Sequence, residues 1–269
     1  MSKIDRAALE LMEMDDMAMG KSTVHSLHPV TKLIVTAVYL VCVTSYSGQD
    51  LSGLVPMVIY QAFLFPLSGI PFGTCFRKIR AVIPLLLAFG VPELLLDRGT
   101  ALVISGVAIS KGAISFTVFV LKGILCVSAA FLLTATTPLD RLCAGLRKLH
   151  IPSSITTLFL LTFRYISVMM EELSNMNIAY SLRAPGQRGI NYKVWGSFLG
   201  QLLLRSVDRA QELYESMLLR GFDGEMRYAE ERRFNGKDAS VTVFASALIL
   251  AARFINLSLI LGGLLVRGV

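Results

Sequence analysis

Residues that could perform catalysis or hold a metal are sparse in this sequence, and none has the spacing that such chemistry needs. The segment Gly20-Lys21-Ser22-Thr23 resembles the end of a phosphate-binding loop, but the first glycine of that pattern would fall at Asp15. The three histidines, His25, His28 and His150, have no zinc-ligand spacing. We therefore expect that this chain is not an enzyme, binds no cofactor of its own and holds no metal ion.

A cluster of methionines and acids near the amino terminus could act as a metal-collecting tail. It comprises Met12, Met14, Asp15, Asp16, Met17 and Met19. A short amphipathic segment on the inner face of a membrane explains the same composition better. The four cysteines form no Cys-x-x-Cys pair and are expected to be small buried hydrophobes.

Two arginines lie in similar surroundings. Arg183 lies in Ser181-Leu182-Arg183-Ala184-Pro185-Gly186, and Arg220 lies in Leu219-Arg220-Gly221-Phe222-Asp223-Gly224. Each is predicted to occupy the last turn of a helix, where arginine complements the helix dipole and glycine is a common cap. Either site alone favours this structural role. Their pairing in one segment favours docking to a partner, because a guanidinium offers a rigid fork of donors.

The elements that position these arginines follow from composition. The chain has 269 residues, 54% hydrophobic and 17% charged, with a mean hydropathy of +0.62. Soluble domains carry about 25% charged residues. The apolar residues are grouped in runs near the roughly 20 residues that cross a bilayer as helix, without the alternation of barrel strands. The sequence therefore predicts an all-α integral membrane protein. The net charge of +7 fits basic cytoplasmic loops better than a nucleic-acid partner.

Five apolar runs are predicted to cross the membrane. They are 33–46, 51–70, 81–96, 113–135 and 240–266. Pro84 and Pro92 predict a kinked or interrupted third helix. Residues 101–109 are predicted to be an irregular lead-in to the fourth span. Lys122 and Arg253 fall near the middle of their spans, where a cation usually faces the bundle interior or snorkels.

A sixth apolar run, 151–170, is predicted not to cross. With the amino terminus in the cytoplasm, the second and fourth spans bring the basic patches at 77–80 and 141–148 to the inside, as the positive-inside rule requires. If 151–170 also crossed, ten Lys and Arg residues between 171 and 238 would lie outside. We therefore expect a multi-pass protein of the inner or plasma membrane with a cytoplasmic amino terminus, five spans and an outside carboxyl terminus.

The segment between the fourth and last spans is predicted to form a helical domain at the inner face. Between 194 and 218 apolar residues recur at helical spacing among too many charges for a span. Two long helices are expected to end near Arg183 and Arg220. The predicted division is a cytoplasmic segment 1–29, four spans within 30–136, a cytoplasmic coupling-helix domain 137–238 and a final span within 239–269.

Several short segments occur in a specific order along the chain. They are Leu27-His28-Pro29-Val30-Thr31-Lys32-Leu33, Thr136-Thr137-Pro138, Phe163-Arg164-Tyr165-Ile166, Glu171-Glu172 and the two arginine helix ends. Together they resemble the transmembrane T component of energy-coupling factor (ECF) transporters, in particular its CbiQ-like cobalt and nickel branch. The resemblance covers nearly the whole chain, and the ordered set is more specific than any one segment.

The resemblance implies a scaffold subunit that transmits motion from ATPases to a substrate-binding membrane protein. The implied partners are two ATPase subunits, which use the ATP, a CbiM-like substrate-binding S component and the lipid bilayer. It assigns ATPase coupling to Arg183 and Arg220, completed by their neighbours Leu182, Ala184, Leu219 and Gly221. Leu182 and Leu219 replace the small first residue of the usual Ala-Arg-Gly form, and Ala184 replaces its glycine.

The implied substrate is cobalt or nickel, and three alternatives stay open. One is a T component for a vitamin such as biotin. Another is a self-contained permease, which predicts internal repeats and several mid-membrane polar residues, whereas only Lys122 and Arg253 lie there. A membrane enzyme is disfavoured by the lack of His, Cys and carboxylate clusters.

Overall fold

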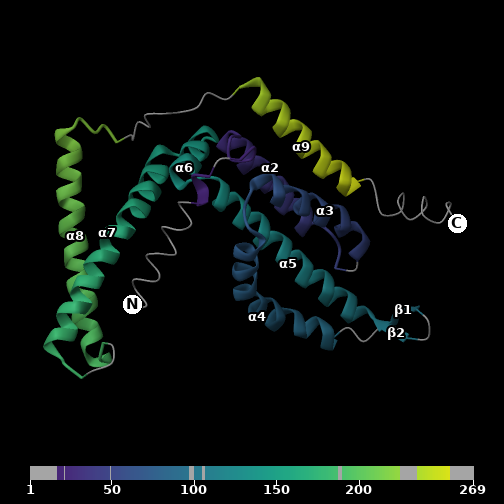
Figure 1. The fold of residues 1–269 in the computed structure, drawn as a ribbon, viewed down its shortest axis with the longest axis horizontal. Helices are drawn as coiled ribbons and strands as arrows, with labels where there is room; N and C mark the ends of the chain where they lie inside the picture. Colours follow the sequence, from purple (N-terminus) through teal and green to yellow (C-terminus); the bar gives the residue numbers. More distant parts are fainter. Residues whose placement is uncertain are drawn as a thin grey trace. The chain divides into compact units, whose positions relative to one another are not determined.

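The computed structural model describes residues 17–20, 22–48, 50–96, 100–104, 107–186, 190–224 and 235–254 (Figure 1). Most of these residues are helical, which confirms the all-α class. In chain order the elements are α2 (Pro29–Thr44), α3 (Leu51–Ser68), α4 (Phe72–Leu96), β1 (Thr100–Ile104), β2 (Val107–Ser110), α5 (Lys111–Thr136), α6 (Leu139–Lys148), α7 (Ser153–Arg183), the 3-10 helix η1 (Tyr192–Val194), α8 (Trp195–Leu219) and α9 (Gly236–Phe254).

The elements divide between two compact units. The bundle unit contains α2 to α5, the strands and α9, whereas the α6–α8 unit contains α6, α7, η1 and α8. The α6–α8 unit spans Leu139–Glu231, which lies inside the predicted segment 137–238. The assignment of that segment to the cytoplasm stays a prediction.

Residues 100–110 differ from the expected irregular lead-in. Strands β1 and β2 pair antiparallel, with Thr100 opposite Ser110 and Ile104 opposite Val107. The expectation was wrong because this stretch is rich in valine and isoleucine, whose branched side chains favour strands. The β-hairpin connects α4 to α5 and leaves the helical class of the protein unchanged.

Three helices among the described residues are long and apolar enough to cross a bilayer, namely α3, α5 and α7. Helix α2 is apolar but shorter. Helix α4 begins at Phe72, nine residues before the predicted run, so the basic patch at 77–80 lies within a helix. Figure 1 shows that α4 bends, as Pro84 and Pro92 predict. Length and apolarity permit α7 to cross, whereas its flanking charges oppose it, so its placement stays a prediction.

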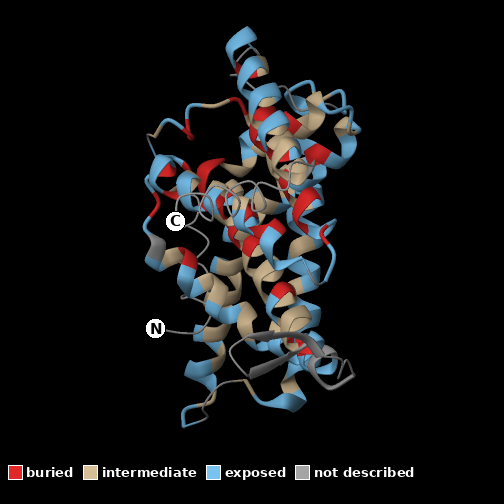
Figure 2. Ribbon diagram, turned by 90° about the vertical axis from the view of Figure 1, so that its right-hand side faces the viewer, coloured by how far each residue is buried: buried red, intermediate tan, exposed pale blue. Residues whose placement is uncertain are grey.

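The core of the bundle unit lies where α2, α3, α5 and α9 meet. Fully buried side chains from these four helices include Val43, Leu54, Val118 and Ile249. The rings of Tyr39 and Tyr60 stack with centroids 5.5 Å apart, which joins α2 to α3. Figure 2 shows the buried residues along the facing sides of these helices.

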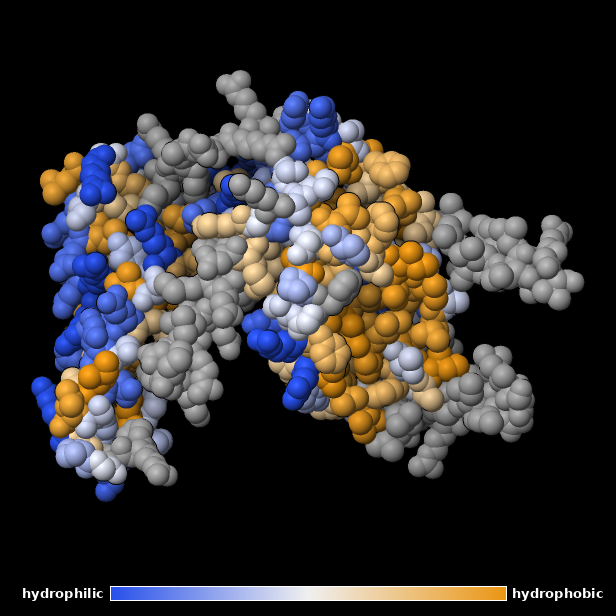
Figure 3. All heavy atoms as spheres, in the orientation of Figure 1, coloured by the Kyte–Doolittle hydropathy of each residue, from blue (hydrophilic) through white to orange (hydrophobic). Residues whose placement is uncertain are grey.

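Large apolar side chains also cover the outside of the bundle unit. Exposed residues there include Val41, Ile59, Phe63, Phe89 and Phe244. Figure 3 shows a continuous apolar face over this unit. A surface of this kind is suited to lipid or to another membrane protein, because water would oppose its exposure.

Close packing of α4 on α5 depends on two glycines. A Cβ atom on Gly90 would lie 2.8 Å from the Phe116 ring, and one on Gly123 would lie 2.4 Å from Leu86. Small residues let membrane helices approach each other in this way. Gly90→Leu is therefore expected to lower the free energy of unfolding by about 1–3 kcal/mol through overpacking.

Thermal unfolding in detergent measures this effect. Gly73→Leu on the same helix is the matched control, because no atom lies within 4 Å of its added Cβ. Equal transition temperatures for the two variants would contradict the packing of α4 on α5.

Candidate functional site

The first of the two arginine helix ends closes α7. Arg183 is the last residue of this helix and is exposed, and Leu182 beside it is 77% exposed. The helix ends because Pro185 disfavours the helical conformation of Ala184, which has φ −125° and ψ 66°. The Ala184 N–H still donates to the Tyr180 carbonyl at 3.0 Å. The prediction of a helix ending near Arg183 is confirmed.

The segment after α7 is tied back to the same helix. The Asn191 N–H donates to the Tyr180 hydroxyl at 3.4 Å, and the Asn191 side chain accepts from the Lys193 N–H at 3.1 Å. These bonds start η1 and then α8 close to the end of α7. Asn191, just before η1, is therefore bonded to the last turn of α7, which carries the exposed Arg183.

The second arginine helix end closes α8 in a Schellman motif. The Phe222 N–H donates to the Met217 carbonyl at 3.0 Å, and the Gly221 N–H donates to the Leu218 carbonyl at 2.9 Å. Arg220 is the C-cap, and Gly221 has φ +79°, a conformation that favours glycine. Arg220 is exposed and Leu219 is 90% exposed, so the cap presents both side chains outward.

Gly221 is expected to fix the direction of Arg220. A β-branched residue at this positive φ costs roughly 1–2 kcal/mol, and the last turn of α8 would fray in response. We expect Gly221→Val to weaken any binding that depends on Arg220 by about tenfold, and Gly221→Asn, which tolerates this conformation, to retain most of it. Partner affinity of the two variants is the measurement, and equal losses would show that the cap conformation is irrelevant.

Helices α7 and α8 form an antiparallel pair. Glu172 near the middle of α7 forms a salt bridge with Arg205 of α8, and Phe222 after α8 lines one groove with Leu158 near the start of α7. Helix α8 is 25 residues long. At 1.5 Å per residue, Arg183 and Arg220 are separated by roughly 37 Å along the pair. The two arginines therefore belong to separate surfaces at opposite ends.

A groove of about 510 Å³ runs between α7 and α8. Its lining is mostly apolar and includes Leu161, Tyr165, Met169, Leu213 and Met217. A second, polar groove of about 460 Å³ lies beside it and is lined by acids of both helices, among them Glu171 and Asp208, and by arginines of α8. The pair thus has an apolar and a charged side.

Comparisons with known proteins agree with these features. Residues 20–229 match the family described as CbiQ, cobalt transport protein. The chain belongs to the CbiQ family. Together with its apolar helices, this membership makes it a membrane protein and an ECF T-type component.

Three curated relatives are similar to this CbiQ-family chain. Nickel permease LarQ of Lactiplantibacillus plantarum is 31% identical over 127 residues, which cover 47% of this chain and 46% of LarQ. The energy-coupling factor transporter transmembrane protein EcfT of Bacillus subtilis is 25% identical, covering 89% of this chain and 97% of EcfT. Cobalt transport protein CbiQ of Rhodobacter capsulatus is 28% identical, covering 65% and 70%. The chain thus spans about half the length of LarQ and nearly all of EcfT.

Lys122 and Arg253, which the sequence predicts near mid-span, both bind the carboxyl end of α2 in this CbiQ-family chain. Lys122 of α5 donates to the Tyr46 carbonyl, and Arg253 of α9 donates to the Ser45 carbonyl at 3.1 Å. The Arg253 guanidinium also lies 4.3 Å from the centre of the Tyr46 ring. Cations at the carboxyl end of a helix satisfy its free carbonyls and its dipole, so these residues have a structural role.

No group of three or more His, Cys, Asp or Glu side chains that could hold a metal occurs among the described residues. His28 caps α2, accepting from the Val30 N–H at 3.2 Å, and His25 lies within hydrogen-bond distance of Ser22. Burial raises the pKa of the Cys143 thiol, and Asp140 raises it further, so this thiol has little nucleophilic character at neutral pH.

Proposed function

We propose that this CbiQ-family chain is the transmembrane coupling subunit of an ATP-driven ECF importer for cobalt or nickel ions. The single observation that carries the proposal is the pair of exposed, capped arginine ends at opposite ends of one antiparallel helix pair. In this proposal each end docks one ATPase, and Leu182 with Ala184 and Leu219 with Gly221 complete the two surfaces. The metal ion is held by a separate substrate-binding membrane subunit.

The physical fit of the arginine ends to this role is specific. A guanidinium on an exposed last turn can bind carboxylates or carbonyls of a partner in a bidentate way. The exposed Leu182 and Leu219 add apolar area beside each charge. A central arginine with an apolar neighbour is typical of residues that dominate protein–protein affinity.

The bundle unit supports a cytoplasmic position for the α6–α8 unit. Helices α2 and α9 run parallel, because Thr31 lies beside Asp238 and Ser45 lies beside Arg253. The carboxyl end of α5 meets the start of α2 through Thr136. Residues 137–235 thus begin and end on the side of the bundle where α2 begins.

This arrangement bears on whether α7 crosses the membrane. A segment that begins and ends on one side crosses an even number of times, so α7 could cross only if α8 also crossed. Helix α8 carries Arg205, Asp208, Arg209, Glu212 and Glu215, too many charges for a span. These facts support the proposal that neither helix crosses and that the amino terminus and the α6–α8 unit are both cytoplasmic.

Reconstitution in proteoliposomes tests the proposed function. The chain is combined with two candidate ATPases and a candidate metal-binding membrane subunit, and uptake of radioactive cobalt and nickel is measured. Uptake is expected only when all subunits, ATP and Mg²⁺ are present. Uptake by this chain alone would overturn the proposal in favour of a self-contained permease, and ATP-dependent uptake of biotin in place of metal would overturn the substrate assignment.

A further inference from the structure

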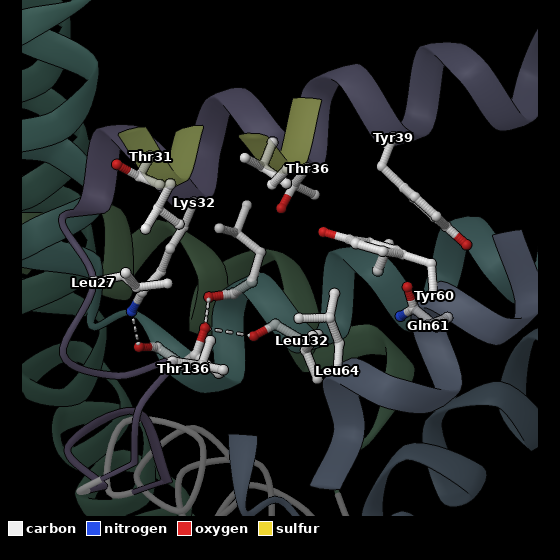
Figure 4. A pocket seen from close by; sticks show the side chains of 16 residues that line it. Leu27, Thr31, Lys32, Thr36, Tyr39, Tyr60, Gln61, Leu64, Leu132 and Thr136 are labelled. Carbon is white, nitrogen blue, oxygen red and sulfur yellow. Dashed lines mark hydrogen bonds between the residues drawn. The ribbon is translucent and has the colours of Figure 1, made fainter. Parts of the chain in front are cut away.

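Three helix ends of the bundle unit meet at the start of α2. Lys32, only 8% exposed, donates from Nζ to the Thr136 carbonyl at 2.8 Å, and Figure 4 shows this bond. The same Nζ lies 3.4 Å from the His25 carbonyl. Thr136 is the last residue of α5, whose final carbonyls lack helical partners, so the ammonium holds α5 by its carboxyl end.

The start of α9 is bonded to the same turn of α2. The Thr31 hydroxyl donates to the Asp238 carbonyl at 3.4 Å, and the Thr31 and Thr242 hydroxyls lie 2.9 Å apart. The Asp238 carboxylate accepts from the His28 N–H at 3.4 Å and from the Asn235 N–H at 3.2 Å. Thr31 and Asp238 are both buried, so these bonds are shielded from water.

These bonds hold the two places where the chain passes between the units. From Thr136 the chain continues into α6, and at Asn235 it returns from α8 before α9 begins. We call Thr31, Lys32 and Asp238, with the Thr136 carbonyl, the helix-end clamp. The clamp joins α2 to the end of α5, three residues before α6 begins, and to the start of α9, so a movement carried into the bundle by either connection reaches α2 through these bonds.

The other contacts of the bundle determine which helices would move together with α2. At its other end α2 is held to α9, since the Tyr46 hydroxyl donates to the Ala252 carbonyl at 3.3 Å and Arg253 binds the Ser45 carbonyl. Toward α3, a cavity of about 130 Å³ adjoins the clamp, and the Gln61 amide nitrogen beside it has no hydrogen-bond partner among the described residues. Helices α2, α5 and α9 are therefore bonded together at the start of α2, where the free volume lies toward α3. Farther along α2, the Tyr39 hydroxyl donates to the Met57 carbonyl of α3 at 3.1 Å.

We infer that Thr31, Lys32 and Asp238 are positioning residues that transmit movement of the α6–α8 unit to α2, α5 and α9 as one body. This inference rests on the proposed coupling function. Loss of the clamp leaves the arginine ends intact, so ATPases still bind and hydrolyse ATP. Less of the movement of the α6–α8 unit then reaches α2, α5 and α9, and fewer ions are imported for each ATP hydrolysed.

The ratio of ions imported to ATP hydrolysed, measured in one proteoliposome preparation, tests the clamp. For Lys32→Met and for Thr31→Val, we expect the ratio to fall roughly fivefold or more while ATPase binding is retained. Thr31→Ser keeps the hydroxyl and should restore the ratio. Lys111→Met and Thr134→Val are matched controls. Lys111 is exposed at the far end of α5, and the hydroxyl of Thr134 bonds to Ala130 and Phe131 of its own helix and to no other described residue.

A merely structural role would lower the yield or stability of these variants without changing the ratio, and an unchanged ratio overturns the inference. If the wild-type chain fails to bind ATPases at all, the proposed function fails, which is a different result. A disulfide in place of the clamp provides a second test, which does not depend on whether Lys32→Met and Thr31→Val fold well. Cysteines at Thr31 and Thr242 are within reach of a disulfide.

The cysteine pair compares two states of the same folded protein. We expect the oxidised Thr31→Cys/Thr242→Cys protein to import ions per ATP as the wild type does, and the reduced protein to show the lowered ratio. The wild type under the same oxidant and reductant controls for its native cysteines, of which Cys42, Cys75 and Cys143 are buried. Equal ratios in both states would overturn the inference.

Discussion

Replacing Arg183 and Arg220 together by glutamate is expected to abolish ATP-driven uptake while leaving the protein folded and in the membrane. Both side chains are exposed at helix ends of the α6–α8 unit. Losing a central arginine from an interface costs roughly 2 kcal/mol or more, which is about 30-fold in affinity at each site. Because the two sites are far apart, their effects should add.

The measurement is ATPase affinity in detergent together with uptake in proteoliposomes. Arg141→Glu is the matched control, since Arg141 is an exposed arginine of the same unit and an acid near the start of α6 is favourable for that helix. Wild-type affinity and uptake in the double variant would show that neither arginine couples to an ATPase.

The second large effect concerns the side of the membrane on which α8 lies. In a variant whose four cysteines are replaced by alanine, a cysteine at the exposed Ser216 is expected to react with a membrane-impermeant maleimide in inside-out vesicles only. The reason is that residues 137–235 begin and end on the cytoplasmic side of the proposed topology. Labelling should change from nearly complete to background when vesicle orientation is reversed.

A cysteine at Ser47 provides the opposite control. Ser47 is exposed between α2 and α3, and the proposed topology places it outside. It should react in right-side-out vesicles only. If the cysteines at Ser47 and Ser216 react from the same side, the five-span topology is wrong.

Much of this fold was predictable because its signals are local. Apolar runs and their length indicate membrane helices, and the proline and glycine after Arg183 and Arg220 predict where α7 and α8 end. The same sequence signals placed both arginines in exposed last turns. Their roles in docking are not visible in the fold itself and stay predictions.

The features that were missed depend on contacts between distant residues. The strands β1 and β2 had a local signal in their valines and isoleucines, but the clamp had none. Lys32 and Thr136 are 104 positions apart, and Thr31 and Asp238 are 207 apart. Sequence spacing could not pair these residues. The segment that contains Lys32 supported the family resemblance but predicted no contact for Lys32. Lys122 and Arg253 were predicted to be cations near mid-span. Their shared partner, the carboxyl end of α2, is visible only in the structure.

The central claim is that each arginine helix end holds one ATPase. Native mass spectrometry of the purified complex counts the ATPase copies bound to the wild type, to Arg183→Glu, to Arg220→Glu and to the double variant. The antiparallel geometry predicts two copies for the wild type, one for each single variant and none for the double variant. Two copies retained by the double variant would contradict the claim.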